Sequence, residues 1–157
     1  MKKLLISLLL GAAILTTGCT QAKEIGKVNN IENKVEENIG EKSIEEIRKD
    51  GIEYIDSFLK VNLSDCYDGY YADENGITIK FVDDGIVELL EADEELYEKF
   101  VELNLNVCKQ VSDILKADKN YFICITYTDR HKEGDKTFTN TFFVIVDSEI
   151  TYNAIKR

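Results

Sequence analysis

Histidine is nearly absent from this 157-residue sequence, and His131 is its single example. One imidazole excludes a metal centre that needs two or more histidines. His131 lies in the segment DRHKEG, residues 129–134, which is typical of an exposed hairpin tip. A cysteine–histidine catalytic pair would have to bring Cys66, Cys108 or Cys124 to that tip. We expect no such pair, because the cysteines of helices and strands are usually small buried hydrophobes.

Cysteine is also scarce, with four residues, of which Cys19 belongs to an N-terminal segment described below. The other three allow at most one disulfide within the chain, and whether Cys66, Cys108 and Cys124 form one stays open. No pair has metal-ligand spacing. The sequence also lacks a nucleophile elbow, a phosphate-binding glycine loop and a zinc-protease helix. We therefore predict no catalytic residue, no metal site and no cofactor.

Basic residues are fewer than acidic ones: the sequence has 19 Lys and Arg and 30 Asp and Glu, which give a formal net charge of −11. Such a surface repels phosphate backbones and anionic lipid headgroups. It argues against nucleic acid as a partner and against a membrane-binding face on the folded part of the chain. Cationic partners and bound cations remain compatible, although most acidic surfaces only improve solubility.

Long apolar runs are limited to one, at the start of the chain. Lys2 and Lys3 precede an apolar stretch from residue 4 to residue 15, and small residues follow at 16–18. This layout is typical of a secretory signal. A membrane-spanning helix needs about 20 apolar residues, and the polar residues 20–24 end this run too early.

The segment LTTGCT, residues 15–20, resembles the lipobox of bacterial lipoprotein precursors. The resemblance implies that residues 1–18 are a cleaved signal peptide and that Cys19, the new first residue, carries a diacylglyceryl group. One position departs from the family pattern: Thr16 stands three places before the cysteine, where leucine is usual, and Leu15 precedes it. Two acyl chains anchor a protein stably. The expected location is the outer, extracytoplasmic face of the cell membrane.

Cleavage would leave 139 residues and, with the loss of Lys2 and Lys3, a formal charge of −13. This length predicts one domain, residues 43–157, and is too short for the two lobes of a solute-binding lipoprotein. Residues 19–42 are predicted to be a lipidated N-terminus and flexible tether with a reach of about 25 Å. A marginal helix is the alternative for this segment, with an apolar face of Val28, Ile31, Val35 and Ile39.

Two helices are predicted, at residues 43–60 and 93–116. The first begins with SIEE, a capping box, and continues with apolar residues at three- and four-residue steps. Gly51 interrupts it at a cost of about 1 kcal/mol relative to alanine, and marks a close approach of backbones. The second begins at Asp93 as N-cap and carries one continuous apolar stripe.

Six strands are predicted around these helices, at residues 66–71, 77–81, 86–90, 121–129, 137–146 and 150–155. Asn75-Gly76 is a hairpin signal between the first two strands. The order predicts an α+β fold, a single domain in which an antiparallel sheet of short strands has both helices packed on one face. It also raises the hypothesis that a helix-plus-three-strands unit occurs twice.

The turn at residues 73–76 resembles part of a calcium loop, but an EF-hand is excluded. That loop needs an acidic residue where Tyr71 stands and a glutamate where Val82 stands. A looser calcium site that combines Asp73 and Glu74 with residues 83 and 84 stays open, beside the plain interpretation of two solvated turns.

One segment, residues 66–73, combines three tyrosines with acidic residues and a glycine. Tyrosine offers contact area and a hydroxyl group at low entropic cost, so this composition is typical of interfaces. The alternative is that tyrosines favour strands and that two of them face the core. The candidate interaction surface consists of Tyr67, Asp68, Tyr70, Tyr71 and Asp73.

The sequence thus predicts a membrane-anchored envelope lipoprotein that acts as a non-enzymatic protein-interaction or binding module. Its expected partners are the membrane, through lipidated Cys19, and an envelope protein. Two alternatives remain: a hydrolase-like envelope enzyme that uses carboxylates, and a carrier of a small ligand or cation. Carboxylates are too abundant here for their number to identify a catalytic pair.

Overall fold

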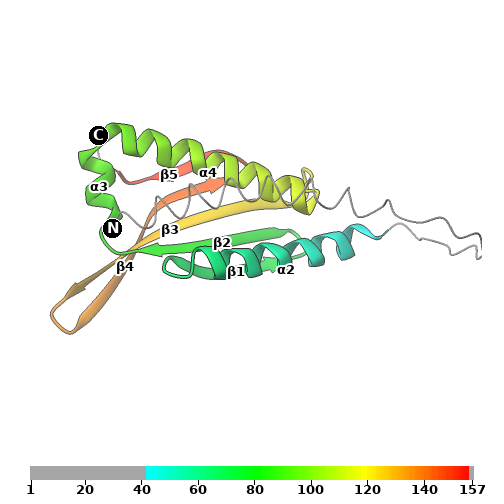
Figure 1. Cartoon of the computed structure of the whole chain (residues 1–157), viewed down its shortest axis with the longest axis horizontal. Coiled ribbons are helices and arrows are strands. Elements are labelled where there is room, and N and C mark those ends of the chain that lie inside the picture. The colour runs from blue at the N-terminus through cyan, green and yellow to red at the C-terminus, as the bar shows by residue number, and fades with distance from the viewer. Residues whose placement is uncertain (1–41, 156–157) are drawn as a thin grey trace, which may run out of the picture.

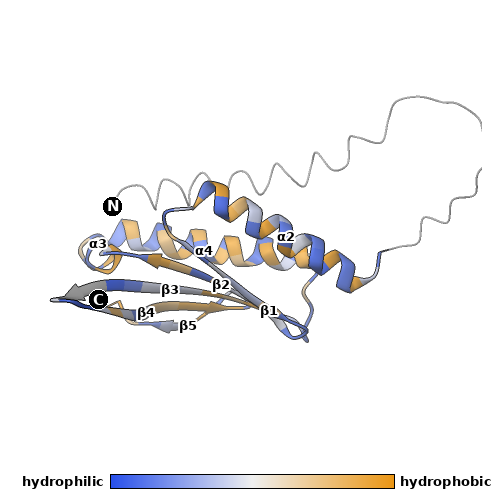
Figure 2. Ribbon diagram, turned by 90° about the horizontal axis from the view of Figure 1, so that it is seen from below, coloured by the Kyte–Doolittle hydropathy of each residue, from blue (hydrophilic) through white to orange (hydrophobic). Residues whose placement is uncertain are grey.

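The structure is a computed structural model that describes residues 42–155, apart from the side chains of residues 131–133. The predicted signal peptide, Cys19 and the tether up to residue 41 lie outside the described residues. Two long helices lie side by side on one face of a five-stranded sheet (Figures 1 and 2). The predicted α+β class is confirmed. No helix in the described range is long and apolar enough to cross a membrane.

The elements follow the order α2 (Ile44–Asn62), β1 (Tyr67–Asp73), β2 (Gly76–Asp83), α3 (Ile86–Ala92), α4 (Glu94–Leu115), β3 (Phe122–Glu133), β4 (Lys136–Val146) and β5 (Glu149–Asn153). In the sheet the strands lie in the order β1-β2-β3-β4-β5. Neighbouring strands are antiparallel except β2 and β3, which are parallel. β1 and β5 are therefore the two edge strands.

Both predicted long helices are confirmed, and their caps explain where they begin. Ser43 Oγ accepts a hydrogen bond from the Glu46 N–H at 3.2 Å, and the Ser43 N–H donates to Glu46 Oε2 at 2.9 Å. This is the expected capping box of α2. At α4, Asp93 Oδ1 accepts from the Leu96 N–H at 3.0 Å. The apolar stripe of α4 faces the sheet and buries Phe100, Leu103, Val107, Val111 and Leu115.

Residues 86–90 were predicted to be a strand, and this prediction is wrong, because they form most of α3. A short apolar run does not distinguish a strand from a helix by its period alone. Ile86 and Leu90 are both buried and lie four residues apart, which is the helical repeat. Leucine and glutamate also favour helix in this segment. The helix-plus-three-strands unit therefore does not occur twice, since only two strands follow α2.

The parallel pairing of β2 and β3 follows from this helix and makes the sheet mixed, where an entirely antiparallel one was predicted. Parallel neighbours need a crossover connection of a dozen or more residues. Residues 84–121 supply it through α3 and α4, which carry the chain back to the end of the sheet where β2 begins.

The buried apolar side chains form one contiguous core between the helices and the sheet. At its centre the ring of Tyr127 stacks on Phe81, with centroids 4.9 Å apart. Its hydroxyl donates to Asn104 Oδ1, and Asn104 Nδ2 donates to the Phe100 carbonyl at 2.7 Å. Asn104 is completely buried, and its side chain both donates and accepts a hydrogen bond. A polar group in an apolar core needs such partners.

Gly51 confirms the expected close approach, which takes place between α2 and the end of α4. A Cβ atom at Gly51 would lie 2.6 Å from Leu115 Cδ2 and 3.2 Å from Ile114 Cγ2. Leu115 is completely buried, so its side chain has little room to move. The absence of a side chain at Gly51 lets α2 pack directly on α4.

Gly51→Ala is expected to lower the free energy of unfolding by roughly 1–3 kcal/mol, because the new methyl group overpacks this contact. The loss should occur although alanine favours helix by about 1 kcal/mol. Urea unfolding followed by circular dichroism measures it, with Cys19→Ala present in every chain compared. Ser57→Ala, at an exposed position of the same helix, is the control and should change stability by less than about 0.5 kcal/mol. Equal or greater stability of Gly51→Ala would contradict the contact.

Candidate functional site

The tyrosine-rich segment forms β1, an edge strand with a bulge that decides where each tyrosine points. The register shifts between Tyr67 and Gly69, and Gly69 has a φ of 96°, which favours glycine. Tyr67 pairs with the buried Phe81 and Tyr70 with the buried Ile79, so both tyrosines lie on the helix side of the sheet. Without the extra residue they would lie on opposite faces.

Tyr67 connects β1 to α2. Its hydroxyl donates to Asp56 Oδ1 at 2.8 Å, and Asp56 also accepts from Lys60 Nζ at 2.7 Å. Its ring contacts Phe81, with centroids 6.0 Å apart. Burial and the hydrogen bond to Asp56 raise the pKa of the Tyr67 hydroxyl. We assign a structural role to this member of the predicted surface.

Tyr70 and Tyr71 remain exposed on opposite faces of β1, with 42% and 59% of their surface accessible. Tyr71 pairs with Thr78 on the face of the sheet that α2 and α4 do not cover. Asp73 is the last residue of β1, and its Oδ1 accepts from the Asn75 N–H at 2.8 Å in the following turn. The structure thus divides the predicted surface between different environments.

A groove of about 520 Å³ lies between the first half of α2 and β1, and we call it the α2–β1 groove. Tyr70 and Asp73 line it, so two residues of the predicted surface meet here. Its apolar part comes from Ile52, Ala72 and Tyr70. Its other lining residues are charged or polar: Glu45, Arg48, Lys49, Glu53, Glu74 and Tyr121.

Arg48 and Tyr121 form a stacked pair in this groove. The guanidinium carbon of Arg48 lies 4.1 Å from the centroid of the Tyr121 ring, within the range of a cation–π contact. The Arg48 side chain is 17% exposed and Tyr121 is 3% exposed. Sequence reasoning missed both residues, since a lone arginine in a helix and a tyrosine before a strand give no signal of their proximity.

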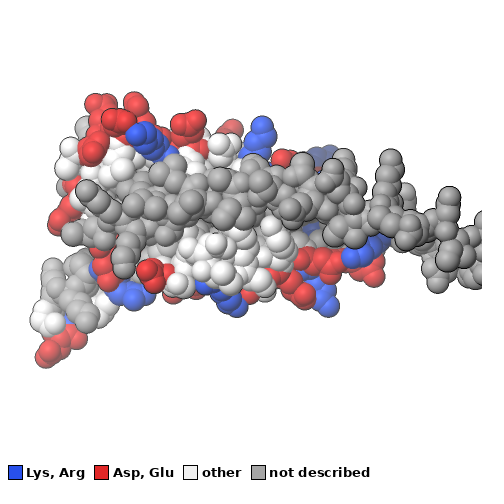
Figure 3. All heavy atoms as spheres, viewed as in Figure 1, with Lys and Arg blue, Asp and Glu red and all other residues white. Residues whose placement is uncertain are grey.

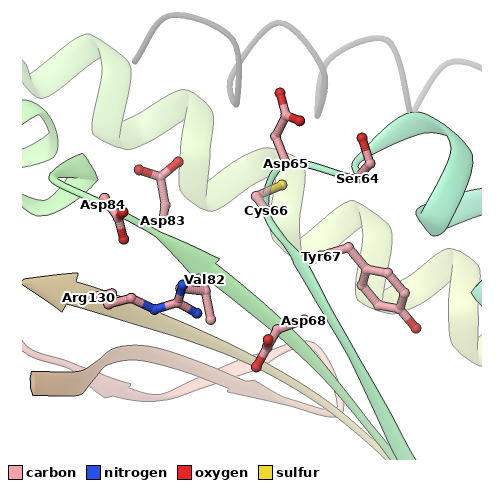
Figure 4. A pocket seen from close by; sticks show the side chains of 9 residues that line it. All are labelled: Ser64, Asp65, Cys66, Tyr67, Asp68, Val82, Asp83, Asp84 and Arg130. Carbon is pink, nitrogen blue, oxygen red and sulfur yellow. The ribbon is translucent and has the colours of Figure 1, made fainter. Parts of the chain in front are cut away.

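A second, polar pocket of about 370 Å³ lies at the other end of β1, and we call it the acidic pocket (Figure 4). Four carboxylates and one cationic side chain, that of Arg130, line it. The carboxylates belong to Asp65, Asp68, Asp83 and Asp84. The Tyr67 side chain points away from the group (Figure 4). Asp83 is half-buried, and this burial, together with the charges of Asp84 and Asp129, raises the pKa of its carboxyl group.

The looser calcium site is wrong, because β2 separates its halves. Asp73 and Glu74 lie in the turn before this eight-residue strand, whereas Asp83 and Asp84 lie at its other end. A strand of this length spans about 25 Å, far more than a cation site. Among the described residues, no group of three or more His, Cys, Asp and Glu is arranged to hold a metal ion.

The three cysteines outside the N-terminal segment are free thiols. Burial raises the pKa of Cys66 to about 12, and burial also raises the pKa values of Cys108 and Cys124. Cys108 Sγ accepts a hydrogen bond from the Ser148 N–H at 3.2 Å. Because the thiolate is the reactive form, these thiols are poor nucleophiles at neutral pH. His131 lies in the end of the β3–β4 hairpin, which projects beyond the sheet (Figure 1).

Asp83→Asn is expected to stabilise the fold at pH 7, raising Tm by roughly 1–3 °C. The folded pKa of Asp83 lies above its unfolded value, so the charged carboxylate opposes folding at pH values above the folded pKa. The gain should shrink as the pH falls through the folded pKa and disappear below pH 3.8, where the wild-type carboxyl becomes protonated in both states. Thermal unfolding between pH 3.5 and 7.5 measures it.

Asp65→Asn is the matched control, since Asp65 lines the same pocket but is exposed. Its effect on Tm should be smaller and should not follow the same pH profile. A lower Tm of Asp83→Asn at pH 7 would show that the charged carboxylate makes a stabilising contact and would contradict the interpretation.

Comparison with protein-family models, with curated proteins and with solved structures found no match to this chain.

Proposed function

We propose that this chain is a membrane-anchored lipoprotein of the cell envelope and acts as a non-enzymatic protein-interaction module. Its partner binds at the α2–β1 groove and along the adjoining edge of β1. The observation that carries the proposal is that an edge strand with two exposed tyrosines borders a groove of about 520 Å³.

The edge of β1 supports this function because an edge strand presents backbone N–H and C=O groups to a partner. An extended segment of another protein adds to such an edge through main-chain hydrogen bonds, and side-chain pockets beside the strand give specificity. Tyr70 lies between these two features, since it belongs to β1 and lines the groove. Aromatic side chains with polar tips are enriched in protein interfaces.

The N-terminal lipid supports an interaction that takes place at the membrane. The predicted tether ends at residue 42, and Glu45 and Arg48, within the first five residues of α2, already line the groove. Anchoring both partners to one membrane raises the effective concentration of each near the other. Figure 3 shows acidic side chains gathered where α3 meets α4, and Glu91, Glu94 and Glu95 are exposed there. They repel anionic headgroups and favour a domain held away from the lipid surface.

A second candidate function rests on the acidic pocket. The raised pKa of Asp83, next to other carboxylates, is a property of general acids in enzymes. A hydrolase-like envelope enzyme is the corresponding proposal, and Asp83→Asn should then abolish a hydrolytic activity in the purified protein. We place it second because structural groups of charges also raise the pKa values of carboxyls, and the thiol of Cys66 is held protonated.

Site-specific photo-crosslinking in intact cells tests the interaction. A photoreactive amino acid at Tyr70 should give a defined crosslinked species, whereas the same residue at Tyr152, an exposed tyrosine on the opposite edge strand β5, should give none. Cys19→Ala should reduce the Tyr70 product at least tenfold, because the domain then leaves the membrane. Equal crosslinking from both positions, or none from Tyr70, would contradict the proposed binding face.

A further inference from the structure

We propose that the α2–β1 groove receives an acidic residue of the partner, whose carboxylate binds Arg48 and Tyr121, and that basic residues flank this acidic residue in the partner segment. The inference rests on the proposed function and names the chemistry of the partner. It depends on three observations: buried donors beside the groove that lack hydrogen-bond acceptors, the stacking of Arg48 on Tyr121, and the acidic rim of the groove.

The first observation concerns hydrogen bonds. Arg48 Nε, Arg48 Nη2 and Tyr121 Oη are buried, and no residue of the described part of the chain hydrogen-bonds to them. Nε and Nη2 form one edge of the guanidinium group, and such an edge binds both oxygens of a carboxylate with two parallel hydrogen bonds. The tyrosine hydroxyl adds a third donor. Buried polar groups are nearly always paired, so this set is unusual and fits a bound acceptor.

The second observation concerns position. The Tyr121 ring is 97% buried and holds the guanidinium carbon of Arg48 at 4.1 Å from its centroid. Asp118 Oδ2 lies 3.7 Å from Arg48 Nη2, which is close enough to balance charge but too long for a hydrogen bond. Since Arg48 Nε, Arg48 Nη2 and Tyr121 Oη are all covered, a carboxylate reaches them only when the Arg48 side chain leaves this stack and turns its Nε–Nη2 edge into the groove.

The third observation concerns the rim. Four carboxylates line the groove against the single ammonium group of Lys49; they belong to Glu45, Glu53, Asp73 and Glu74. A uniformly acidic ligand would be repelled by this rim, and a purely basic one would leave Arg48 and Tyr121 without an acceptor. A segment with one acidic residue between lysines or arginines would place its carboxylate against Arg48 and Tyr121 and its cations against the carboxylates of the rim.

The test uses two fluorescein-labelled peptides, acetyl-KKAEAKK-amide and the same peptide with glutamine in place of glutamate. Binding to the mature lipidated protein in phosphatidylcholine nanodiscs is measured by fluorescence anisotropy. We expect saturable binding of the glutamate peptide and at least tenfold weaker binding of the glutamine peptide. The comparison is sharp because the glutamine peptide is more positive, so nonspecific attraction to this acidic protein would produce the opposite order.

Variants then assign the effect to the two residues. Arg48→Lys keeps the charge but removes the two-pronged edge, and should weaken binding of the glutamate peptide about tenfold while leaving the glutamine peptide unchanged. Tyr121→Phe keeps the stacked ring and removes only the hydroxyl. It should weaken binding of the glutamate peptide about threefold. Arg130→Lys, in the acidic pocket, is the matched control and should have no effect. Thermal unfolding of each variant verifies its fold.

Equal or tighter binding of the glutamine peptide would overturn the inference. The same loss of glutamate-peptide binding in Arg130→Lys as in Arg48→Lys would also overturn it. So would unchanged binding by folded Arg48→Lys and Tyr121→Phe variants. If the peptides fail to discriminate while Tyr70 still crosslinks to a partner in cells, the carboxylate subsite is refuted and the interaction module stands. If the peptides fail to discriminate and Tyr70 also gives no crosslink, both the carboxylate subsite and the proposed function are refuted.

Discussion

The contact of Gly51 with Leu115 determines where α2 lies, and the candidate binding site depends on that position. Direct packing on α4 holds α2 over the β1 side of the sheet, where Asp56 accepts the hydrogen bond from Tyr67. The same placement brings the first half of α2 beside β1 and leaves the α2–β1 groove between them. A side chain at Gly51 would push the helix outward and change the walls of this groove.

Much of the fold could be predicted from local sequence, because the decisive interactions are local. Ser43 and Asp93 cap helices whose apolar residues repeat at helical spacing, and Asn75-Gly76 marks a hairpin. Residues 86–90 were assigned wrongly because a short apolar run fits both a strand and a buried helix. That one error also made the predicted sheet topology wrong, since the crossover through α3 and α4 makes β2 and β3 parallel.

The candidate site was predictable only in part. Composition identified the tyrosine-rich segment, but the bulge at Gly69, which places Tyr67 and Tyr70 on one side, depends on pairing with β2. Tyr67 therefore became a link to α2, and Asp68 joined the acidic pocket. The pairing of Arg48 with Tyr121 joins two distant parts of the chain and exists only in the folded protein. Whether this surface binds a partner stays a prediction, as do lipidation of Cys19 and the location at the membrane.

We propose the α2–β1 groove as a binding site with a carboxylate subsite at its base. A crystal structure of the chain with the glutamate peptide tests it most directly. We expect peptide along β1, with the glutamate carboxylate within hydrogen-bond distance of Arg48 Nε and Nη2 and of Tyr121 Oη. Peptide bound at the acidic pocket or on β5, with the Arg48 edge still turned away from it, would contradict the proposed carboxylate subsite.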